Sequence, residues 1–260
     1  MELTFLGTAD AFNSAGRGNS CYWIDDAQGS YVVDFGPTAL LQCRRLGLDP
    51  GRLDVVYLTH LHGDHIGGLA LLYIDLLFIR RRTRPLVICG PPGTQARVEA
   101  LLDSAYPAVG AKGAGFDLRY REWDVPGVHQ DGIRRIHTLR ARHDNHAIAS
   151  SLRIEAAGEP TLAFSGDTGW QPELVDLVAG ADAFICECSM VDAIFWGHLS
   201  LEEIRGYRAE LRVGQLFLSH LGDESRVAAM AAADELNLRV AEDGLRVTLG
   251  TPRPPLPPTI

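Results

Sequence analysis

Apolar residues recur along the chain with two different periods. Short runs rich in β-branched and aromatic residues, many of them ending in Gly, Asp, His or Thr, predict strands. These runs cover residues 3–6, 31–35, 55–58, 86–89, 151–154, 161–164, 183–186 and 215–218. Helical spacing is found over residues 66–80, 95–104, 173–178, 201–211 and 225–236. Two mostly β blocks with interspersed helices favour an α/β fold in which helices flank stacked sheets.

Length and composition indicate one ordinary globular domain. The chain has 260 residues, of which 46% are hydrophobic and 22% are charged, and this is enough to bury a large core. We expect a single domain over residues 1–251 and a proline-rich, extended tail over residues 252–260. The formal net charge of −9 argues against a surface built for general attraction to nucleic acid or anionic membrane.

The sequence predicts a cytoplasmic protein with reduced thiols. The opening MELTFLGTAD lacks the basic end and apolar run of a signal peptide. The strongest candidate membrane segment, residues 66–79, contains Asp75 and falls short of the roughly 18 residues needed for a span. Five cysteines are an odd number, which does not suit a disulfide framework.

A cluster of metal-ligand side chains follows the apolar run at residues 53–58. It reads THLHGDHIGG from Thr59 to Gly68 and contains His60, His62, Asp64 and His65. Imidazole nitrogens and carboxylate oxygens are donors that Zn²⁺, Mn²⁺ and Fe ions accept, and a loop at a strand end can direct successive donors to two adjacent centres. The cluster therefore predicts a metal site with room for two ions.

This motif resembles the signature of the metallo-β-lactamase superfamily, and further matches follow in the family's order. The opening MELTFLGTADAF resembles the first strand and loop of the ribonuclease Z and cyclic phosphodiesterase-like branch, and YVVDFG at residues 31–36 resembles its second-strand element. SGDT at 165–168 and LSHL at 218–221 resemble two later ligand motifs. The resemblance implies a four-layer αββα sandwich and a hydrolase with two divalent ions, with zinc favoured over Mn²⁺ or Fe.

The same resemblance implies a ligand set. One metal is expected at His60, His62 and His143 and the other at Asp64, His65 and His220, with Asp167 as the bridge between them. Asp167 and His220 each follow an apolar run, which by itself places both at strand ends. The third histidine stays open, because His146 lies close to His143 in the same segment; we favour His143, which ends the strand-like stretch.

Two further residues indicate the kind of chemistry. His198 resembles the branch histidine that gives a proton to the leaving oxygen, and Glu187 resembles the glutamate that orients it. Asp64 would hold and orient the attacking water and can accept its proton. A proton donor is needed most when the leaving group is an alkoxide, as in a phosphodiester. The expected function is therefore a phosphodiesterase that uses hydroxide formed at a dinuclear metal site.

The expected substrate is a small or cyclic nucleotide-like phosphodiester. A tRNA 3′-processing endoribonuclease is less favoured, because residues 105–115 hold only Lys112 as a basic residue, unlike the basic arm that grips tRNA in ribonuclease Z. The basic cluster at Arg80–Arg84 is interpreted as a solvated helix end. A lactone or thioester hydrolase could use the same metals. A non-catalytic scaffold protein could also bind them without catalysing a reaction. The resemblance also implies that a homodimer can form.

Overall fold

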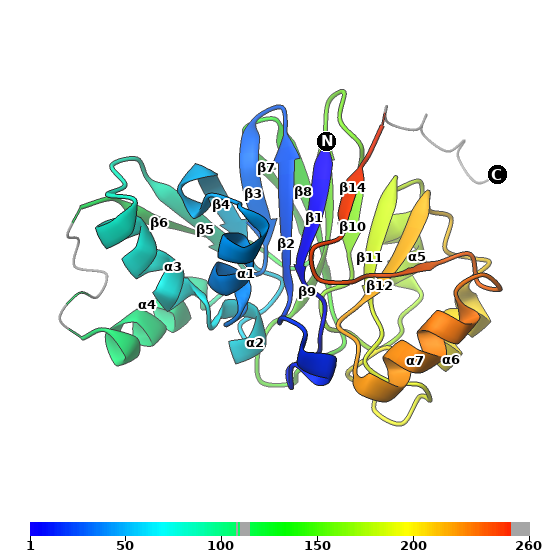
Figure 1. The fold of residues 1–260 in the computed structure, drawn as a ribbon. Helices are drawn as coiled ribbons and strands as arrows, with labels where there is room; N and C mark the ends of the chain where they lie inside the picture. Colours follow the sequence, from blue (N-terminus) through cyan, green and yellow to red (C-terminus); the bar gives the residue numbers. More distant parts are fainter. Residues whose placement is uncertain (108, 110–114, 251–260) are drawn as a thin grey trace.

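The computed structural model describes residues 1–107, 109 and 115–250, and it consists of two seven-stranded mixed sheets packed face to face (Figure 1). The first sheet has the order β14 (Arg246–Thr248), β1 (Glu2–Gly7), β2 (Cys21–Asp26), β3 (Gly29–Val33), β4 (Leu53–Tyr57), β5 (Leu86–Gly90) and β6 (Leu118–Glu122). The second has the order β13 (Arg239–Val240), β12 (Gln215–Ser219), β11 (Ala183–Glu187), β10 (Leu162–Phe164), β9 (Ser150–Ala156), β8 (Arg134–Arg140) and β7 (Gly127–Asp131). The predicted tail at 252–260 lies outside the described residues.

Helices cover the outer face of each sheet. The first sheet carries α1 (Ala39–Leu46), α2 (Gly63–Ile66), α3 (Leu69–Ile74) and α4 (Thr94–Ala105), and the second carries α5 (Glu173–Val178), α6 (Leu201–Tyr207) and α7 (Asp223–Ala232). Short turns of 3-10 helix occur at Ser14–Gly16 and Pro50–Arg52. In Figure 1 the two groups of helices lie on opposite sides of the stacked sheets. The predicted αββα sandwich is confirmed.

Three apolar clusters hold these layers together. One lies between the sheets and includes Phe5, Tyr57 and Phe217, while the other two join each sheet to its own helices. Strands such as β11 are therefore buried along their whole length on both faces. This is why they appear in the sequence as continuous apolar runs and not as alternating patterns.

Parallel strands bring the predicted site residues to one edge of the sandwich. β10, β11 and β12 are mutually parallel neighbours, and Glu187 at the end of β11 pairs with Ser219 at the end of β12. The carbonyl oxygen of Thr59, just after β4 in the first sheet, accepts a hydrogen bond from the backbone N–H of Ser150 in the second, at 2.9 Å. Strand ends from both sheets therefore meet at this edge.

The prediction of one continuous helix over residues 66–80 is wrong. This stretch is divided into α2, α3 and a π-helical segment at Asp75–Ile79. Gly67 and Gly68 lie at the first break, where their backbone packs against the turn after β3, so local spacing alone could not reveal the interruption.

The predicted strands also omit several real ones, namely β2, β6, β7, β8, β13 and β14. β6 and β7 are sheet edges with largely exposed, polar residues. Their weak apolar pattern is typical of edge strands.

All five cysteines are buried and free, which agrees with the predicted reduced thiols. In the part of the chain that the structure describes, no helix is both long enough and apolar enough to cross a bilayer.

Candidate active site

The ligand loop after β4 is held by close backbone packing against the turn after β3. A Cβ atom at Gly68 would lie 2.2 Å from the carbonyl oxygen of Gly36, and one at Gly36 would lie 2.3 Å from the carbonyl oxygen of Asp64. The backbone N–H of Phe35 donates to the carbonyl oxygen of His65 at 2.7 Å. Only glycine permits this approach, so the two glycines help to determine where the ligand loop lies.

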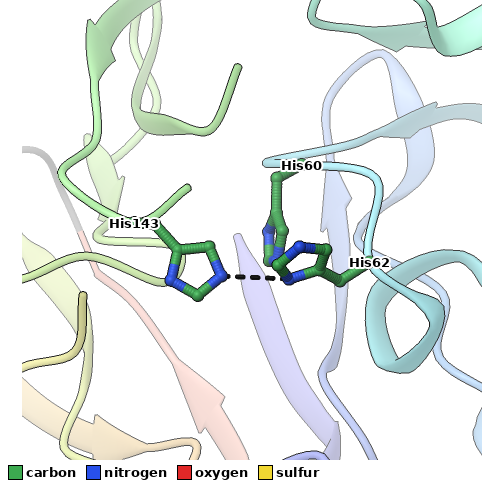
Figure 2. A group of neighbouring side chains, drawn as sticks. All are labelled: His60, His62 and His143. Atoms are coloured by element: carbon green, nitrogen blue, oxygen red, sulfur yellow. Dashed lines mark hydrogen bonds between the residues drawn. The ribbon is translucent and has the colours of Figure 1, made fainter. Parts of the chain in front are cut away.

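Three histidines from two loops converge on one point. His60 and His62 come from the loop after β4, while His143 comes from the loop between β8 and β9 (Figure 2). His143 Nε2 lies 3.0 Å from His62 Nδ1. One ligand atom from each of the three lies within 4.8 Å of the others, which is a separation that one metal ion can span.

A second group lies beside the first and contains Asp167, which also faces the first group. Asp64, His65, Asp167 and His220 again place one ligand atom each within 4.8 Å of one another. Asp167 Oδ1 lies 3.3 Å from His65 Nε2, whereas its Oδ2 lies 3.7 Å from His60 Nε2 and 3.8 Å from His143 Nε2. Its Oδ2 also lies 3.4 Å from His220 Nε2, so Oδ2 approaches both groups whereas Oδ1 faces His65 of the second group. The Asp167 carboxylate thus lies between the two groups, where it could serve both.

The unpartnered atoms in these groups fit a metal. His60 Nε2 and His65 Nε2 are buried and make no hydrogen bond within the described residues, although carboxylate oxygens lie 3.2 to 3.7 Å away. A buried polar nitrogen without a partner is costly unless something else satisfies it. The donor set, histidine nitrogen with carboxylate oxygen, suits a divalent ion such as Zn²⁺, Mn²⁺ or Fe²⁺.

The protonation states of His60 and Asp167 fit metal binding, whereas His65 and His220 would release protons on binding an ion. Burial opposes the charge on these two rings, but the neighbouring carboxylates outweigh it and raise the pKa of both. Burial lowers the pKa of His60 well below its usual value, and His65 adds to this effect. Burial opposes the charge on Asp167, but the neighbouring imidazoles of His220, His65 and His60 outweigh it and hold the pKa of Asp167 well below its usual range. His60 is thus neutral and Asp167 is ionised, and these are the forms that bind metal.

Asp34 orients the ligand loop and was not among the predicted site residues. Its Oδ2 accepts a hydrogen bond from His65 Nδ1 at 2.7 Å and another from Thr59 Oγ1 at 2.8 Å. Bonding at Nδ1 leaves His65 Nε2 free to face Asp167. Asp34 belongs to the YVVDFG motif and has a left-handed φ of 58°. Its position in this matched motif could have identified Asp34 as a site residue from the sequence. Its contact with His65, however, depends on the tertiary structure.

Beside the two groups, the half-buried His198 forms an ion pair with the buried Glu187. His198 Nδ1 lies 2.9 Å from Glu187 Oε1. Burial disfavours protonation of the ring, but the Glu187 carboxylate outweighs this effect and raises the pKa of His198 to about 9. The imidazolium form therefore predominates at neutral pH, so His198 is equipped to donate a proton.

Ser189 joins this pair to the metal-ligand groups and was also not predicted from the sequence. Its hydroxyl donates to Glu187 Oε2 at 2.7 Å and lies 2.9 Å from His220 Nδ1. A hydroxyl that donates to the carboxylate can accept from the ring nitrogen, which leaves His220 Nε2 facing Asp64 at 3.3 Å. Ser189 follows Glu187 by two residues, and no motif in the sequence marks it.

The two candidates for the third histidine occupy different places. His143 is buried, and its Nδ1 donates to the carbonyl oxygen of Gly197 at 2.8 Å, so that Nε2 points toward His62. His146 is exposed and belongs to none of the groups of potential ligands found among the described residues.

We expect His143→Ala to lower bound metal by about one ion per chain, because three donors would become two. His146→Ala, three residues away, is expected to keep the wild-type content. Metal content of the two purified variants, measured by mass spectrometry, distinguishes them. The reverse pattern would assign the ligand to His146.

Comparison with known proteins agrees with this architecture. The family described as anti-Pycsar protein Apyc1 matches residues 1–240. A ribonuclease Z of Bradyrhizobium diazoefficiens is 29% identical over an alignment that covers 94% of this chain and 98% of that protein. The metallo-β-lactamase fold protein YhfI from Bacillus subtilis has a TM-score of 0.77 at 20% identity, covering 95% of this chain and 98% of its own. The short form of human tRNase Z has a TM-score of 0.75 at 22% identity, covering 96% and 100%. This chain therefore belongs to the Apyc1 family of anti-Pycsar proteins, within the ribonuclease Z-like branch of the metallo-β-lactamase superfamily.

Proposed function

We propose that this protein is a phosphodiesterase that hydrolyses a small or cyclic nucleotide-like phosphodiester with two divalent ions, most suitably Zn²⁺. The observation that carries the proposal is the Glu187–His198 pair beside the ligand groups. A phosphodiester with an alkoxide leaving group needs a proton donor, whereas hydrolysis of an activated ester does not. His198 lies beside the ligand groups, where it could give a proton to the leaving oxygen.

Each group of residues has a distinct task in this proposal. His60, His62 and His143 would hold one ion, Asp64, His65 and His220 the other, and Asp167 both. When bound, two divalent ions supply Lewis-acid activation of water and of the phosphate oxygens.

The remaining steps belong to side chains of the protein. Burial disfavours the charge on Asp64, but His65 and the hydrogen bond from His220 outweigh it and lower the Asp64 pKa. The ionised carboxylate can orient the attacking water, but its lowered pKa makes it a weak acceptor for the water's proton. His198 then gives its Nε2 proton to the leaving oxygen while Glu187 keeps the ring oriented through Nδ1.

Contacts of the basic cluster favour a small substrate over tRNA. Arg80 pairs with Asp75 and Asp49, and Arg84 pairs with Asp54. The guanidinium of Arg82 donates to three backbone carbonyls. These three arginines contribute to the fold, and only Arg81 of the cluster is exposed without a side-chain partner among the described residues. Of the stretch compared with the tRNA-gripping arm, residues 108 and 110–114 lie outside the described residues.

A carboxylic-ester substrate, such as a lactone or thioester, is the second candidate, because the same metal groups could serve it. The proposal is tested by metal analysis of the purified protein together with four substrates: bis(p-nitrophenyl) phosphate, a 3′,5′-cyclic nucleotide, a pre-tRNA and a lactone. We expect hydrolysis of the first two, loss of activity with a chelator and recovery when Zn²⁺ or Mn²⁺ is returned. Activity on the lactone alone would reject the proposal, and preference for pre-tRNA would favour the endoribonuclease.

We also infer a cytoplasmic location and assembly as a homodimer. Five free, buried cysteines suit a reducing compartment. The homodimer is supported by the family resemblance alone.

A further inference from the structure

Exposed aromatic side chains lie directly beside the proposed proton donor. Phe195 and Trp196 precede His198 in the loop between β11 and α6, and their exposed fractions are 47% and 45%. The ring centroids of Phe195 and His198 are 5.8 Å apart, and the two rings are inclined at 41°. The Trp196 ring is a second neighbour of Phe195, with centroids 5.7 Å apart. An aromatic surface therefore continues from the proton donor toward solvent.

This placement distinguishes Phe195 from the other exposed aromatic residues. In the part of the chain that the structure describes, these are Phe12, Phe78, Trp196 and Tyr207. Tyr207 stacks on Trp170 with ring centroids 3.9 Å apart. Of the exposed rings among the described residues, Phe195 is the one that makes a ring contact with a proposed site residue. A ligand bound at the site could cover this apolar surface.

Close backbone packing fixes the loop that carries Phe195. A Cβ atom at Gly169, two residues after the bridging carboxylate, would lie 1.9 Å from the carbonyl oxygen of Trp196. One at Gly197 would lie 2.9 Å from the carbonyl oxygen of His143. The carbonyl oxygen of Gly197 also accepts the hydrogen bond from His143 Nδ1 at 2.8 Å. The loop is thus held against both ligand groups, and Phe195 has a defined place at the edge of the site.

The shape of a cyclic nucleotide matches this arrangement. In a 3′,5′-cyclic nucleotide only the ribose separates the nucleobase from the scissile phosphate, so the base must lie near the group that protonates the leaving oxygen. The flat faces of nucleobases stack on aromatic side chains, and this stacking contributes to binding without requiring a particular base. Phe195 offers a π face and no charged or hydrogen-bonding group. It therefore suits a flat aromatic ring better than a charged group.

We propose that the nucleobase of the cyclic nucleotide stacks on Phe195, with Trp196 supporting the Phe195 ring. This inference rests on the proposed function and deepens it, because the enzyme would then select phosphodiesters that carry a base close to the scissile phosphate. Phe195 is a specificity-determining residue in this proposal, since it contacts the substrate and takes no part in proton transfer.

The test compares cyclic AMP with the same 3′,5′-cyclic phosphate carrying hydrogen in place of adenine. Both substrates have an alkoxide leaving group and need His198 equally, so only the base differs. We expect the metal-loaded wild-type enzyme to favour cyclic AMP by at least about tenfold in kcat/KM, mainly through a lower KM. Phe195→Leu keeps apolar bulk but removes the π face, so it should raise KM for cyclic AMP about fivefold or more. Phe195→Tyr should keep the wild-type preference.

Phe78→Leu is the matched control for Phe195→Leu. Phe78 is an exposed phenylalanine in the π-helical segment at Asp75–Ile79, outside the loops that carry the site residues. The control should change neither kcat nor KM for either substrate. Circular dichroism and light scattering of all three variants check the fold and the oligomeric state.

The outcomes separate this inference from the proposed function. Absence of activity on both cyclic phosphates and on bis(p-nitrophenyl) phosphate would reject the proposed function, and the inference with it. Activity without a preference for the base, or a preference that survives in Phe195→Leu, would overturn the inference and leave the proposed function intact. Equal losses on both substrates in Phe195→Leu would also overturn it, because the ring would then act through His198. A changed oligomeric state with an unchanged preference would assign Phe195 to an interface between copies of this chain instead.

Discussion

Asp167→Asn is expected to lower kcat/KM by at least about a thousandfold, which corresponds to about 4 kcal/mol of transition-state stabilisation. Asp167 lies between the two ligand groups, with Oδ1 facing His65 and Oδ2 within 3.4 to 3.8 Å of His220, His60 and His143. Asparagine keeps the shape of the side chain but offers one oxygen and no charge, so it cannot serve two ions. Activity on bis(p-nitrophenyl) phosphate and metal content per chain measure the effect.

Asp176→Asn is the matched control for this variant. Asp176 is a residue of α5 outside the ligand groups, and its loss changes net charge by the same amount. We expect the control to retain full metal content and activity. Circular dichroism of both variants checks that the fold is kept. Retention of two metals and full activity in Asp167→Asn would contradict the bridging role.

His198→Ala is expected to discriminate between leaving groups. The loss in kcat should be about a hundredfold or more for a cyclic nucleotide, whose alkoxide must be protonated, and small for bis(p-nitrophenyl) phosphate, whose phenolate leaves unaided. Glu187→Gln should produce the same pattern more weakly, because the ring would lose its charged partner. His137→Ala is a suitable control, since His137 pairs with Glu155 at 3.3 Å on β8 and β9. Equal losses on both substrates would reject His198 as the proton donor.

The raised pKa of His198 adds a pH dependence with a defined sign. A pKa of about 9 means that the ring carries its proton below pH 9 and loses it as the pH rises further. Wild-type turnover of the cyclic nucleotide should therefore fall above about pH 9. Turnover of the p-nitrophenyl diester should show no such decrease. In His198→Ala, neither substrate should show this decrease in turnover above about pH 9.

Most of the candidate site could be predicted from the sequence because its motifs resemble those of the metallo-β-lactamase superfamily, and several of the matched residues also follow apolar strands. The loop from His60 to His65 follows β4, Asp167 follows β10, and His220 follows β12. The structure brings together all seven predicted ligands. Their metal binding and the catalytic roles of Glu187 and His198 remain predictions for the experiments above.

Other features depend on contacts between segments far apart in the chain. The edge strands β6 and β7 carry too little apolar signal because one side of each meets solvent. The 66–80 segment contains good helix formers, yet packing of Gly67 and Gly68 against the turn after β3 interrupts it. No local pattern contains that contact.

The sequence by itself determined an α/β fold and the chemistry of the donors, because these follow from apolar periodicity and residue type. The αββα sandwich and the ligand set followed from the resemblance of its motifs to a known family. Only the tertiary structure decided that His143 and not His146 faces His62, that Asp34 and Ser189 orient the ligand rings, and that the Phe195 ring contacts His198. The physical reason is distance along the chain. Hydrogen bonds and charge pairs act over a few ångströms, so they depend on which strand ends and loops the packing of two sheets brings together.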